Sequence, residues 1–261
     1  MINKIYVIWH KESFKKDINQ RLEVCFPDVE VEYIKPAPAG NDPNFKQWLK
    51  DNDYDYMKNW KQGDKPNPDE EYTDFWSRDI KTGEIACAIG HYRAWCMAKK
   101  DNVKKALFLE QDCIIRMGQY DKLDKLLSTL QNSGYSYDVI YTGHCETSLR
   151  YKGEPDEYGL VKPLYVYCLH SYVVTNKGID ILLSNEFEKN IFPVDDYVAS
   201  LNVPLSGETG TNSYGLKDNK MHPELGHLKQ QINAYVLKKQ LFPQMEKDYG
   251  LSGTEGSPYI D

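Results

Sequence analysis

The chain has 261 residues, of which 41% are hydrophobic, so it can bury a sizeable core and is not intrinsically disordered. Its 39 acidic residues outnumber 32 basic ones, and the net charge of −7 argues against a general nucleic-acid-binding protein, because phosphate binding needs a positive surface. The sequence contains no apolar run long enough for a transmembrane helix.

The first elements predict a parallel strand–helix–strand unit. Residues 4–9, rich in Ile, Val and Tyr, form the first expected strand and are too short an apolar run for a secretory signal peptide. We expect Ser13 to cap the following helix. Apolar residues recur along one face of that helix at Phe14, Ile18, Leu22 and Cys25. Residues 29–33 alternate apolar and acidic side chains as a second strand, so the order predicts an α/β fold.

Residues 36–82 interrupt this regular pattern. Prolines and glycines break the stretch, and it contains three of the five tryptophans. A connection this long inside a compact domain is usually functional, so one interpretation is a lid or a substrate-binding loop. The other interpretation is a variable surface insertion with a short helix near residues 45–52.

The clearest predicted helix covers residues 83–100. Its expected core face follows helical spacing at Ile85, Ala88, Ile89, Tyr92 and Cys96. The remaining elements are expected as strands over residues 105–109, 138–142, 165–169 and 172–174, and as helices around residues 120–130, from Thr175 to Leu183 and from Pro223 through Val236. No periodicity follows Met245. We therefore expect one domain over residues 1–245 and a C-terminal tail over residues 246–261.

Composition also bears on the cellular compartment. The six cysteines are scattered without a CxxC pair, which favours reduced thiols over a disulfide framework or a zinc knuckle. The chain is rich in Lys, Asn and Tyr, as is typical of some bacteria and large DNA viruses. We expect a cytoplasmic protein, in a bacterium or in a virus-infected host cell.

Two acidic residues follow the predicted strand 105–109. Glu110 and Asp112 are separated by one residue, and alternation along a strand directs residues i and i+2 to the same side. Mg²⁺ and Mn²⁺ prefer carboxylate oxygens, and ligands bind outside the carboxyl ends of strands in open α/β sheets. The pair is a candidate metal site; the alternative is a pair of solvated acids at a strand end.

A second group of polar side chains lies on the predicted helix 83–100. Glu84, His91 and Trp95 fall in a narrow stripe beside its apolar face. A carboxylate, an imidazole and an indole in line can border a cleft. The alternative is a Glu–His pair satisfied at the surface.

Three residues nearer the C-terminus are further candidates. Asp195 and Asp196 follow Pro193 in an expected turn, where one of them can act as a general base or bind acceptor hydroxyls. His222 can complete a metal shell; the alternative is an exposed loop histidine. The chain contains no Walker A, GxGxxG, HExxH or GxSxG motif.

Two segments carry a resemblance to a known family. Residues 82–91 read TGEIACAIGH and are followed by Trp95, and residues 106–112 read ALFLEQD. They resemble the signature of glycosyltransferase family 25, roughly TxGEIGCxxSH, a Trp and ALILEDD. Shorter matches follow the family's order at APAG (37–40), HSYVV (170–174) and PVD (193–195), so the resemblance spans about residues 4–200.

This family includes lipooligosaccharide and collagen galactosyltransferases. The resemblance implies a GT-A-like, Rossmann-like domain with a mixed central sheet flanked by helices. It implies inverting transfer of galactose or glucose from a UDP-sugar to a hydroxyl of a glycan or glycoprotein acceptor, with Mn²⁺ or Mg²⁺ as cofactor. The metal ligands it implies are Glu110 and Asp112, and His222, which lies beyond the part that resembles the family, is the further candidate ligand named above. Donor binding falls to Ile8, Gly83, His91 and Glu110, and catalysis to Asp195 as general base, with Glu84 as the alternative base or as a residue that holds a sugar hydroxyl.

The chain departs from the family pattern at three positions. Gln111 replaces the middle Asp of EDD, Ala39 replaces the acid of the family's AVDG, and Gly90 replaces the serine of SH. Two rival functions follow: a non-catalytic GT-A-like domain that binds sugar or nucleotide, and a hydrolase of nucleotide sugars. A transferase releases UDP faster when an acceptor is present, whereas a hydrolase needs no acceptor and a binding domain releases none.

Overall fold

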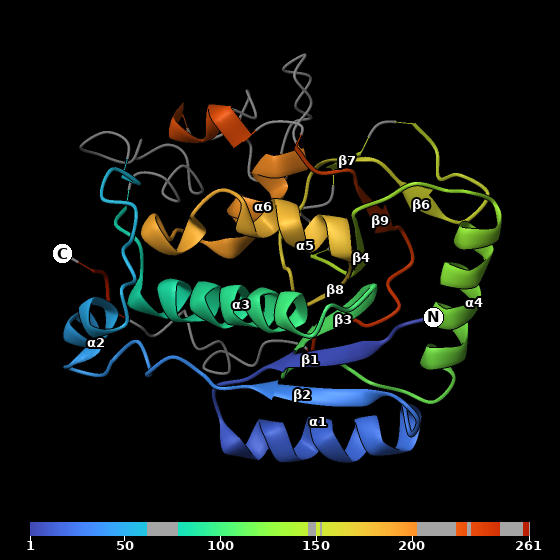
Figure 1. Ribbon diagram of the computed structural model, residues 1–261, viewed down its shortest axis with the longest axis horizontal. Helices are drawn as coiled ribbons and strands as arrows, with labels where there is room; N and C mark the ends of the chain where they lie inside the picture. Colours follow the sequence, from blue (N-terminus) through green and yellow to red (C-terminus); the bar gives the residue numbers. More distant parts are fainter. Residues whose placement is uncertain are drawn as a thin grey trace, which may run out of the picture.

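A seven-stranded mixed sheet organises the computed structural model, which describes residues 1–61, 78–145, 150–151, 153–202, 223–228, 231–245 and 258–260 (Figure 1). Its strands, in spatial order, are β2 (Glu30–Ile34), β1 (Lys4–Ile8), β3 (Lys105–Glu110), β8 (Ser171–Thr175), β4 (Val139–Gly143), β9 (Ala234–Leu237) and β6 (Leu160–Val161). A two-stranded sheet pairs β5 (Arg150–Tyr151) with β7 (Pro163–Tyr165). The helices are α1 (Glu12–Cys25), α2 (Phe45–Asp51), α3 (Thr82–Lys100), α4 (Gln119–Asn132), α5 (Asn176–Leu183) and α6 (Val194–Asn202), with 3-10 helices η1 (Phe187–Lys189) and η2 (Pro223–Leu228).

Strand directions make this sheet mixed, as the sequence predicts. β1 pairs in parallel with both β2 and β3, which confirms the expected strand–helix–strand unit. β8 runs antiparallel between β3 and β4, and β9 runs parallel to β4. The start of β8 therefore lies beside the carboxyl end of β3, with Ser171 paired to Leu109. The α/β fold class with helices flanking a mixed sheet is confirmed.

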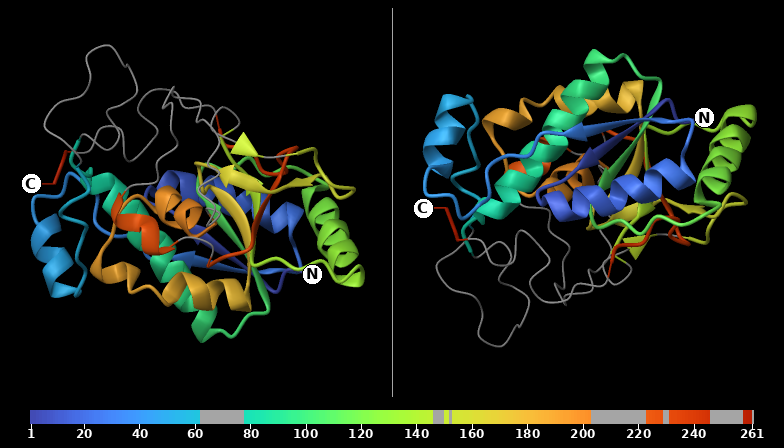
Figure 2. Two further views of the ribbon diagram at one scale, coloured as in Figure 1. Left: turned by 90° about the horizontal axis from the view of Figure 1, so that it is seen from above. Right: turned by 90° about the horizontal axis from the view of Figure 1, so that it is seen from below.

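Helices cover both faces of the sheet (Figure 2). The face that carries Ala106 and Phe108 packs in one core cluster with α2, α3, α5 and α6. The face that carries Leu107 and Leu109 packs in a second cluster with α1 and α4. These four residues are consecutive on β3, and alternation along the strand sends each to the opposite layer from its neighbour. A continuous apolar run is what a strand buried on both faces requires.

The start of α1 corrects one expectation. The helix begins at Glu12 with Lys11 at its N-cap position, so Ser13 lies inside the first turn and is not the cap. The side-chain oxygen of Gln111 instead accepts the backbone N–H groups of His10 and Lys11, at 2.9 and 3.1 Å. A residue a hundred positions away thus fixes this helix start, and local capping rules cannot detect such a contact.

The C-terminal helix expected from Pro223 through Val236 is wrong in its second half. η2 ends at Leu228, and Val236 lies on β9, paired to Tyr141 and Val161. Ala234 and Val236 are fully buried, whereas Tyr235 and Leu237 belong to the other core cluster. Apolar residues four positions apart fit both a helical and a strand period, so their spacing alone does not separate the two. The strand expected over residues 165–169 is wrong beyond its first residue, because β7 covers Pro163–Tyr165 and residues 166–169 form no strand.

The long connection over residues 36–82 is described on both sides of residues 62–77. The short helix expected near residues 45–52 is confirmed as α2. Its lid or substrate-loop interpretation stays a prediction, and residues 62–77 of the segment lie outside the described part. Residues 258–260 lie against the start of α3, where Tyr259 bridges to Lys81 and the Ile260 N–H bonds to the Ile80 carbonyl at 2.9 Å. Within the described residues, no helix has both the length and the apolar character needed to cross a membrane.

Candidate active site

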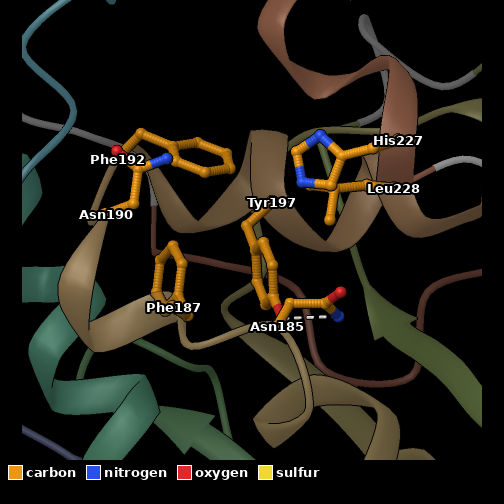
Figure 3. Close-up of a pocket in the computed structure, with 7 residues that line it drawn as sticks. All are labelled: Asn185, Phe187, Asn190, Phe192, Tyr197, His227 and Leu228. Atoms are coloured by element: carbon orange, nitrogen blue, oxygen red, sulfur yellow. Dashed lines mark hydrogen bonds between the residues drawn. The ribbon is translucent and has the colours of Figure 1, made fainter.

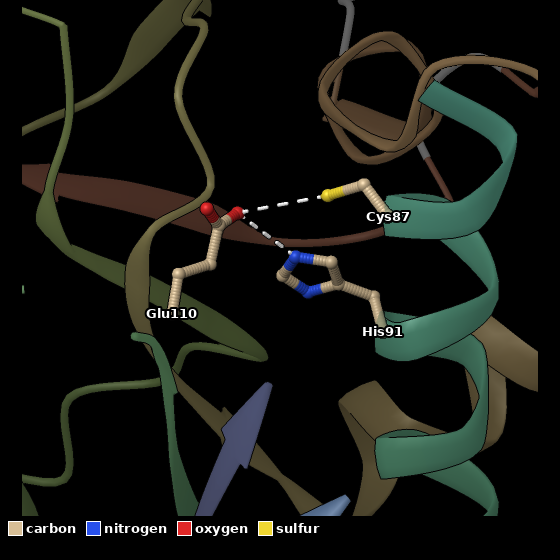
Figure 4. Close-up of side chains that lie close together, drawn as sticks. All are labelled: Cys87, His91 and Glu110. Atoms are coloured by element: carbon tan, nitrogen blue, oxygen red, sulfur yellow. Dashed lines mark hydrogen bonds and ion pairs between the residues drawn. The ribbon is translucent and has the colours of Figure 1, made fainter. Parts of the chain in front are cut away.

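The carboxyl ends of β1 and β3 meet the N-terminal half of α3. Glu110 closes β3 opposite Ile8 at the end of β1, and its N–H bonds to the His170 carbonyl just before β8 at 2.8 Å. Cys87 and His91 extend from α3 toward the Glu110 carboxylate (Figure 4). The site therefore lies at the strand ends, where ligands bind in open α/β sheets.

A buried chain of hydrogen bonds leads from α3 to this carboxylate. The Trp95 indole N–H donates to the Tyr172 hydroxyl at 2.9 Å, and that hydroxyl lies 2.8 Å from His91 Nδ1. His91 Nε2 lies 3.1 Å from Glu110 Oε1. His91, Trp95 and Tyr172 are fully buried. His91 and Trp95, which were expected at the margin of the apolar face, therefore lie in the protein interior. The alternative of a Glu–His pair at the surface is wrong, because His91 is buried.

The charge of Glu110 is held by its surroundings. Burial acts to raise the pKa of Glu110, but the hydrogen bond and charge of His91, with contributions from His170 and His10, outweigh it. The pKa of Glu110 therefore lies below its ordinary value. This carboxylate stays ionised at neutral pH.

The charges of four carboxylates act on the Cys87 thiol. Burial raises the pKa of Cys87 well above its ordinary value, and the charges of Glu110, Asp195, Asp112 and Glu84 add to the shift. These are four of the five acids that the sequence singles out for the site; the fifth is Asp196. The fold brings the electric fields of these acids together at Cys87, a residue for which the sequence predicted no role. Its spacing of four residues from His91 was the available signal.

Glu84 has a structural role at the start of α3. Its Oε2 accepts the Lys81 N–H at 2.8 Å and an Arg78 N–H at 3.0 Å. A glutamate three residues into a helix can satisfy the free N–H groups of the first turn. Gly40 lies against the same turn, because a Cβ there would come within 2.6 Å of the Gly83 nitrogen. The APAG segment and the TGE segment of the family signature are therefore adjacent in space.

Asp195 lies in the first turn of α6 and not in a free turn. Its two oxygens accept the N–H groups of Cys168 at 3.0 Å and Leu169 at 2.9 Å. Cys168 adopts a left-handed φ of 67°, which presents these consecutive N–H groups to the carboxylate. Burial, then the charge of Glu110, raises the pKa of Asp195 despite the two hydrogen bonds. The geometry fixes Asp195 near Glu110 and makes it a stronger proton acceptor than an exposed aspartate.

Asp112 does not continue the strand. β3 ends at Glu110, and the Cys113 N–H bonds back to the Glu110 carbonyl, so strand alternation no longer relates the two acids. Asp112 Oδ2 accepts from the Gln244 side chain at 2.8 Å. Its charge still acts on Cys87, as does that of Glu110. The expected metal ligand His222 lies outside the described residues.

A hollow lies beside η1, α6 and η2 (Figure 3). The rings of Phe187 and Tyr197 stack there with centroids 4.2 Å apart. The Trp95 ring lies at similar centroid distances from the two, 6.0 Å from Phe187 and 5.9 Å from Tyr197. The hollow is lined by Asn185, Phe187, Asn190, Phe192, Tyr197, His227 and Leu228. None of the residues expected for the site lines it.

Curated proteins with known names match part of this chain. Procollagen galactosyltransferase 1 of Danio rerio is 27% identical over 130 residues, which is 49% of this chain and 22% of the relative. A glycosyltransferase 25 family member of Drosophila melanogaster is 31% identical over 126 residues, which is 46% and 20%. The human inactive glycosyltransferase 25 family member 3 is 26% identical over 132 residues, which is 49% and 22%. The matches thus span about a fifth of each relative.

A family comparison covers more of the chain. The profile of glycosyltransferase family 25 (LPS biosynthesis protein) matches residues 56–198, which is more than half of the chain. That match includes α3, the end of β3 and Asp195 at the start of α6. It therefore contains the residues whose charges act on Cys87. This chain belongs to glycosyltransferase family 25.

Proposed function

We propose that the chain transfers a hexose from a UDP-sugar to a hydroxyl of a glycan or glycoprotein acceptor, with inversion at the anomeric carbon. The charges of Glu110, Asp195, Asp112 and Glu84 all act on the Cys87 thiol at the strand ends, and this observation carries the proposal. Relatives named procollagen galactosyltransferase favour galactose as the hexose. Ile8, Gly83 and His91 are the proposed residues around the donor.

The acids suit a divalent cation, as the resemblance to the family signature implies. Glu110 is held ionised, and Asp112 contributes a second carboxylate whose charge acts on the same thiol. Carboxylate oxygens are the ligands that Mn²⁺ and Mg²⁺ prefer. We assign Glu110 and Asp112 as the residues that would hold this ion, with His222 from outside the described part. When bound, it supplies positive charge for the departing nucleoside diphosphate.

Asp195 is the proposed general base. An inverting transfer needs a carboxylate that removes the proton of the acceptor hydroxyl as it attacks. The N–H groups of Cys168 and Leu169 orient this carboxylate, and burial with the charge of Glu110 raises its pKa. Glu84 is the weaker candidate, because Arg78 and the Lys81 N–H already engage its oxygens.

A non-catalytic binding domain is the second candidate function. Two observations favour it: Gln111 stands where the family pattern has an acid, and one relative is named inactive. In the structure Gln111 is buried and bonds to His10 and Lys11 instead of entering the group around Cys87. The Gln111 amide therefore stabilises the fold near the site. The carboxylates proposed for catalysis, Glu110 and Asp195, are still present beside it.

UDP release measured with and without acceptor distinguishes these functions. The purified chain is incubated with UDP-galactose or UDP-glucose and Mn²⁺, then with a panel of hydroxylated glycan and glycopeptide acceptors. Release that rises with acceptor supports the transferase. Equal release without acceptor identifies a hydrolase. Binding of the UDP-sugar with no release in either condition identifies a binding domain and contradicts the proposal.

A further inference from the structure

Cys87, His91 and Glu110 form a compact set of metal-binding side chains. One ligand atom from each lies within 4.8 Å of the other two, and this is the one such group of three or more among the residues that the structure describes. Sγ of Cys87 lies 3.9 Å from Glu110 Oε1, and His91 Nε2 lies 3.1 Å from the same oxygen. The three side chains point toward one another across the gap between α3 and β3 (Figure 4).

The backbone holds these three residues in place before any ion binds. Cys87 and His91 are four residues apart in the middle of α3, so they extend from neighbouring turns of one helix face. Glu110 is fixed by the pairing of β3 with β1 and by its own N–H bond to His170. A site on rigid elements loses little conformational entropy when it binds an ion.

The Tyr172 hydroxyl allows His91 to act as a ligand. An indole N–H can only donate, so the Tyr172 oxygen accepts from Trp95 and retains a second lone pair. The Tyr172 hydroxyl can either donate to His91 Nδ1 or accept from Nδ1–H. When Tyr172 instead accepts from Nδ1–H, the Nε2 lone pair faces Glu110 and Cys87. Metal-binding histidines commonly donate their other N–H to an oxygen in this way.

The chemistry of the three ligands selects the metal. One sulfur, one imidazole nitrogen and one carboxylate oxygen suit a borderline cation such as Zn²⁺, whereas Mg²⁺ and Ca²⁺ prefer oxygen alone. The nearby charges of Asp195 and Asp112 also favour a cation at this point. Three protein ligands leave one tetrahedral position open, as in zinc sites that bind water or substrate.

We propose that Cys87, His91 and Glu110 form a Zn²⁺ site, with the fourth position open to water. On binding, the Cys87 thiol releases its proton to solvent and its thiolate sulfur bonds to the metal. The site is distinct in ligand set from the carboxylate site proposed for Mn²⁺ or Mg²⁺, although both use Glu110. Its test needs neither sugar donor nor acceptor, so it stands or fails separately from the proposed transferase activity.

Co²⁺ is the probe, because tetrahedral Co²⁺ bound to a thiolate gives a ligand-to-metal charge-transfer band that oxygen and nitrogen ligands do not give. The metal-stripped full chain is titrated with Co²⁺, and Zn²⁺ is then added in competition. We expect the band in the native chain, its loss in Cys87→Ser, and its retention in Cys96→Ser. Cys96 is a half-buried cysteine on the same helix and outside the site, so it is the matched control. Absence of the band in the native chain, or its persistence in Cys87→Ser, overturns the proposal.

Two further measurements keep the proposal testable if the Cys87→Ser variant fails to fold. X-ray absorption of the zinc-loaded native chain should show one sulfur at about 2.3 Å and nitrogen or oxygen neighbours at about 2.0 Å. A shell without sulfur overturns the proposal. Tyr172→Phe should keep the cobalt band but weaken Zn²⁺ binding by about 10- to 100-fold, because His91 loses the oxygen that orients it. Unchanged zinc affinity in a folded Tyr172→Phe variant removes the assigned role of Tyr172.

Discussion

Asp195 shows how single residues acquire their chemistry here. Its carboxylate accepts two consecutive backbone N–H groups, yet burial and the charge of Glu110 still raise its pKa. The hydrogen bonds fix its direction, and the surrounding charge increases its basicity. A carboxylate that is held in this direction and whose pKa is raised is suited to accept a proton during transfer.

Asp195→Asn should separate catalysis from donor binding. We expect acceptor-dependent turnover to fall about a hundredfold to ten-thousandfold while UDP-sugar affinity is kept. An amide has one acceptor oxygen for the N–H groups of Cys168 and Leu169, so the free energy of unfolding should also fall, by about 1–3 kcal/mol. Steady-state kinetics, calorimetric donor binding and urea unfolding on one preparation separate the effects.

Two controls accompany this prediction. Asp196→Asn changes the adjacent acid and should affect turnover less. The acid limb of kcat/KM in the native chain should lie above the ordinary aspartate range, because Asp195 must lose its proton to act and its pKa is raised. Normal turnover of Asp195→Asn, together with an inactive Glu84→Gln, would move the base to α3.

Asp112→Asn should weaken the joint binding of UDP-sugar and Mn²⁺. Asparagine can keep the hydrogen bond with Gln244 but removes the charge that a bridging cation needs. Titration calorimetry with and without Mn²⁺ measures the effect. Asp180→Asn is the control. It changes an exposed acid of α5 that pairs with Lys99 of α3, and this variant should bind UDP-sugar and Mn²⁺ normally. Equal metal-dependent affinity in Asp112→Asn would remove Asp112 from the ligand set.

At the scale of elements, the close approach of α3 to β1 explains one departure from the family pattern. A Cβ at Gly90 would come within 2.8 Å of Cγ2 of Ile8. Ile8 is branched at Cβ and cannot move this methyl group freely. A serine at position 90, as in the family signature, therefore conflicts with isoleucine at position 8 in this chain.

Gly90→Ala should accordingly lower the free energy of unfolding, although alanine has a higher helix propensity than glycine. The gain in helix propensity is about 1 kcal/mol, whereas overpacking costs about 1–3 kcal/mol. In an Ile8→Ala background the clash is absent, so the same change should become neutral or stabilising. A double-mutant cycle by urea unfolding measures the coupling between the two positions. Additive effects would show that the contact is not tight.

The helices and strands also differ in how well their own sequence predicts their type and bounds. β3, α4 and α5 are all close to the predicted ranges, because each has a regular period bounded by polar residues. β9 was expected to be helical, since its apolar spacing fits both periods and its partners β4 and β6 lie far away in sequence. Strand pairing, not local propensity, decides such a segment.

On the scale of the whole molecule, residues near the chain end support the site. Ile260 is 4% exposed and belongs to the core cluster that contains α3, and its N–H bonds to the Ile80 carbonyl. The Thr82 N–H likewise bonds to the Pro258 carbonyl at 2.9 Å. These contacts hold the turn from which Glu84 and Gly83 enter the site.

Ile260→Ala should therefore lower the free energy of unfolding by about 2–5 kcal/mol, as for other buried isoleucines cut to alanine. Hydrogen exchange should also speed up in the first turn of α3 more than in α4, which belongs to the other core cluster. Tyr259→Ala changes a half-exposed neighbour and should cost less. Uniform exchange throughout the chain would show that Ile260 supports overall stability only.

Periodic apolar residues and the ordered TGE, ALFLEQD and PVD segments were enough to predict the mixed α/β fold and the family, because these signals are local in the chain. The combined effect of the charges of Glu84, Asp112 and Asp195 on Cys87 depends on bringing together segments more than a hundred residues apart. The same holds for Gln111 at the start of α1 and for the buried link from Trp95 through Tyr172 to His91. Burial and electric fields are properties of the packed chain, so the pKa shifts and the Cys87–His91–Glu110 set arise only when distant elements meet.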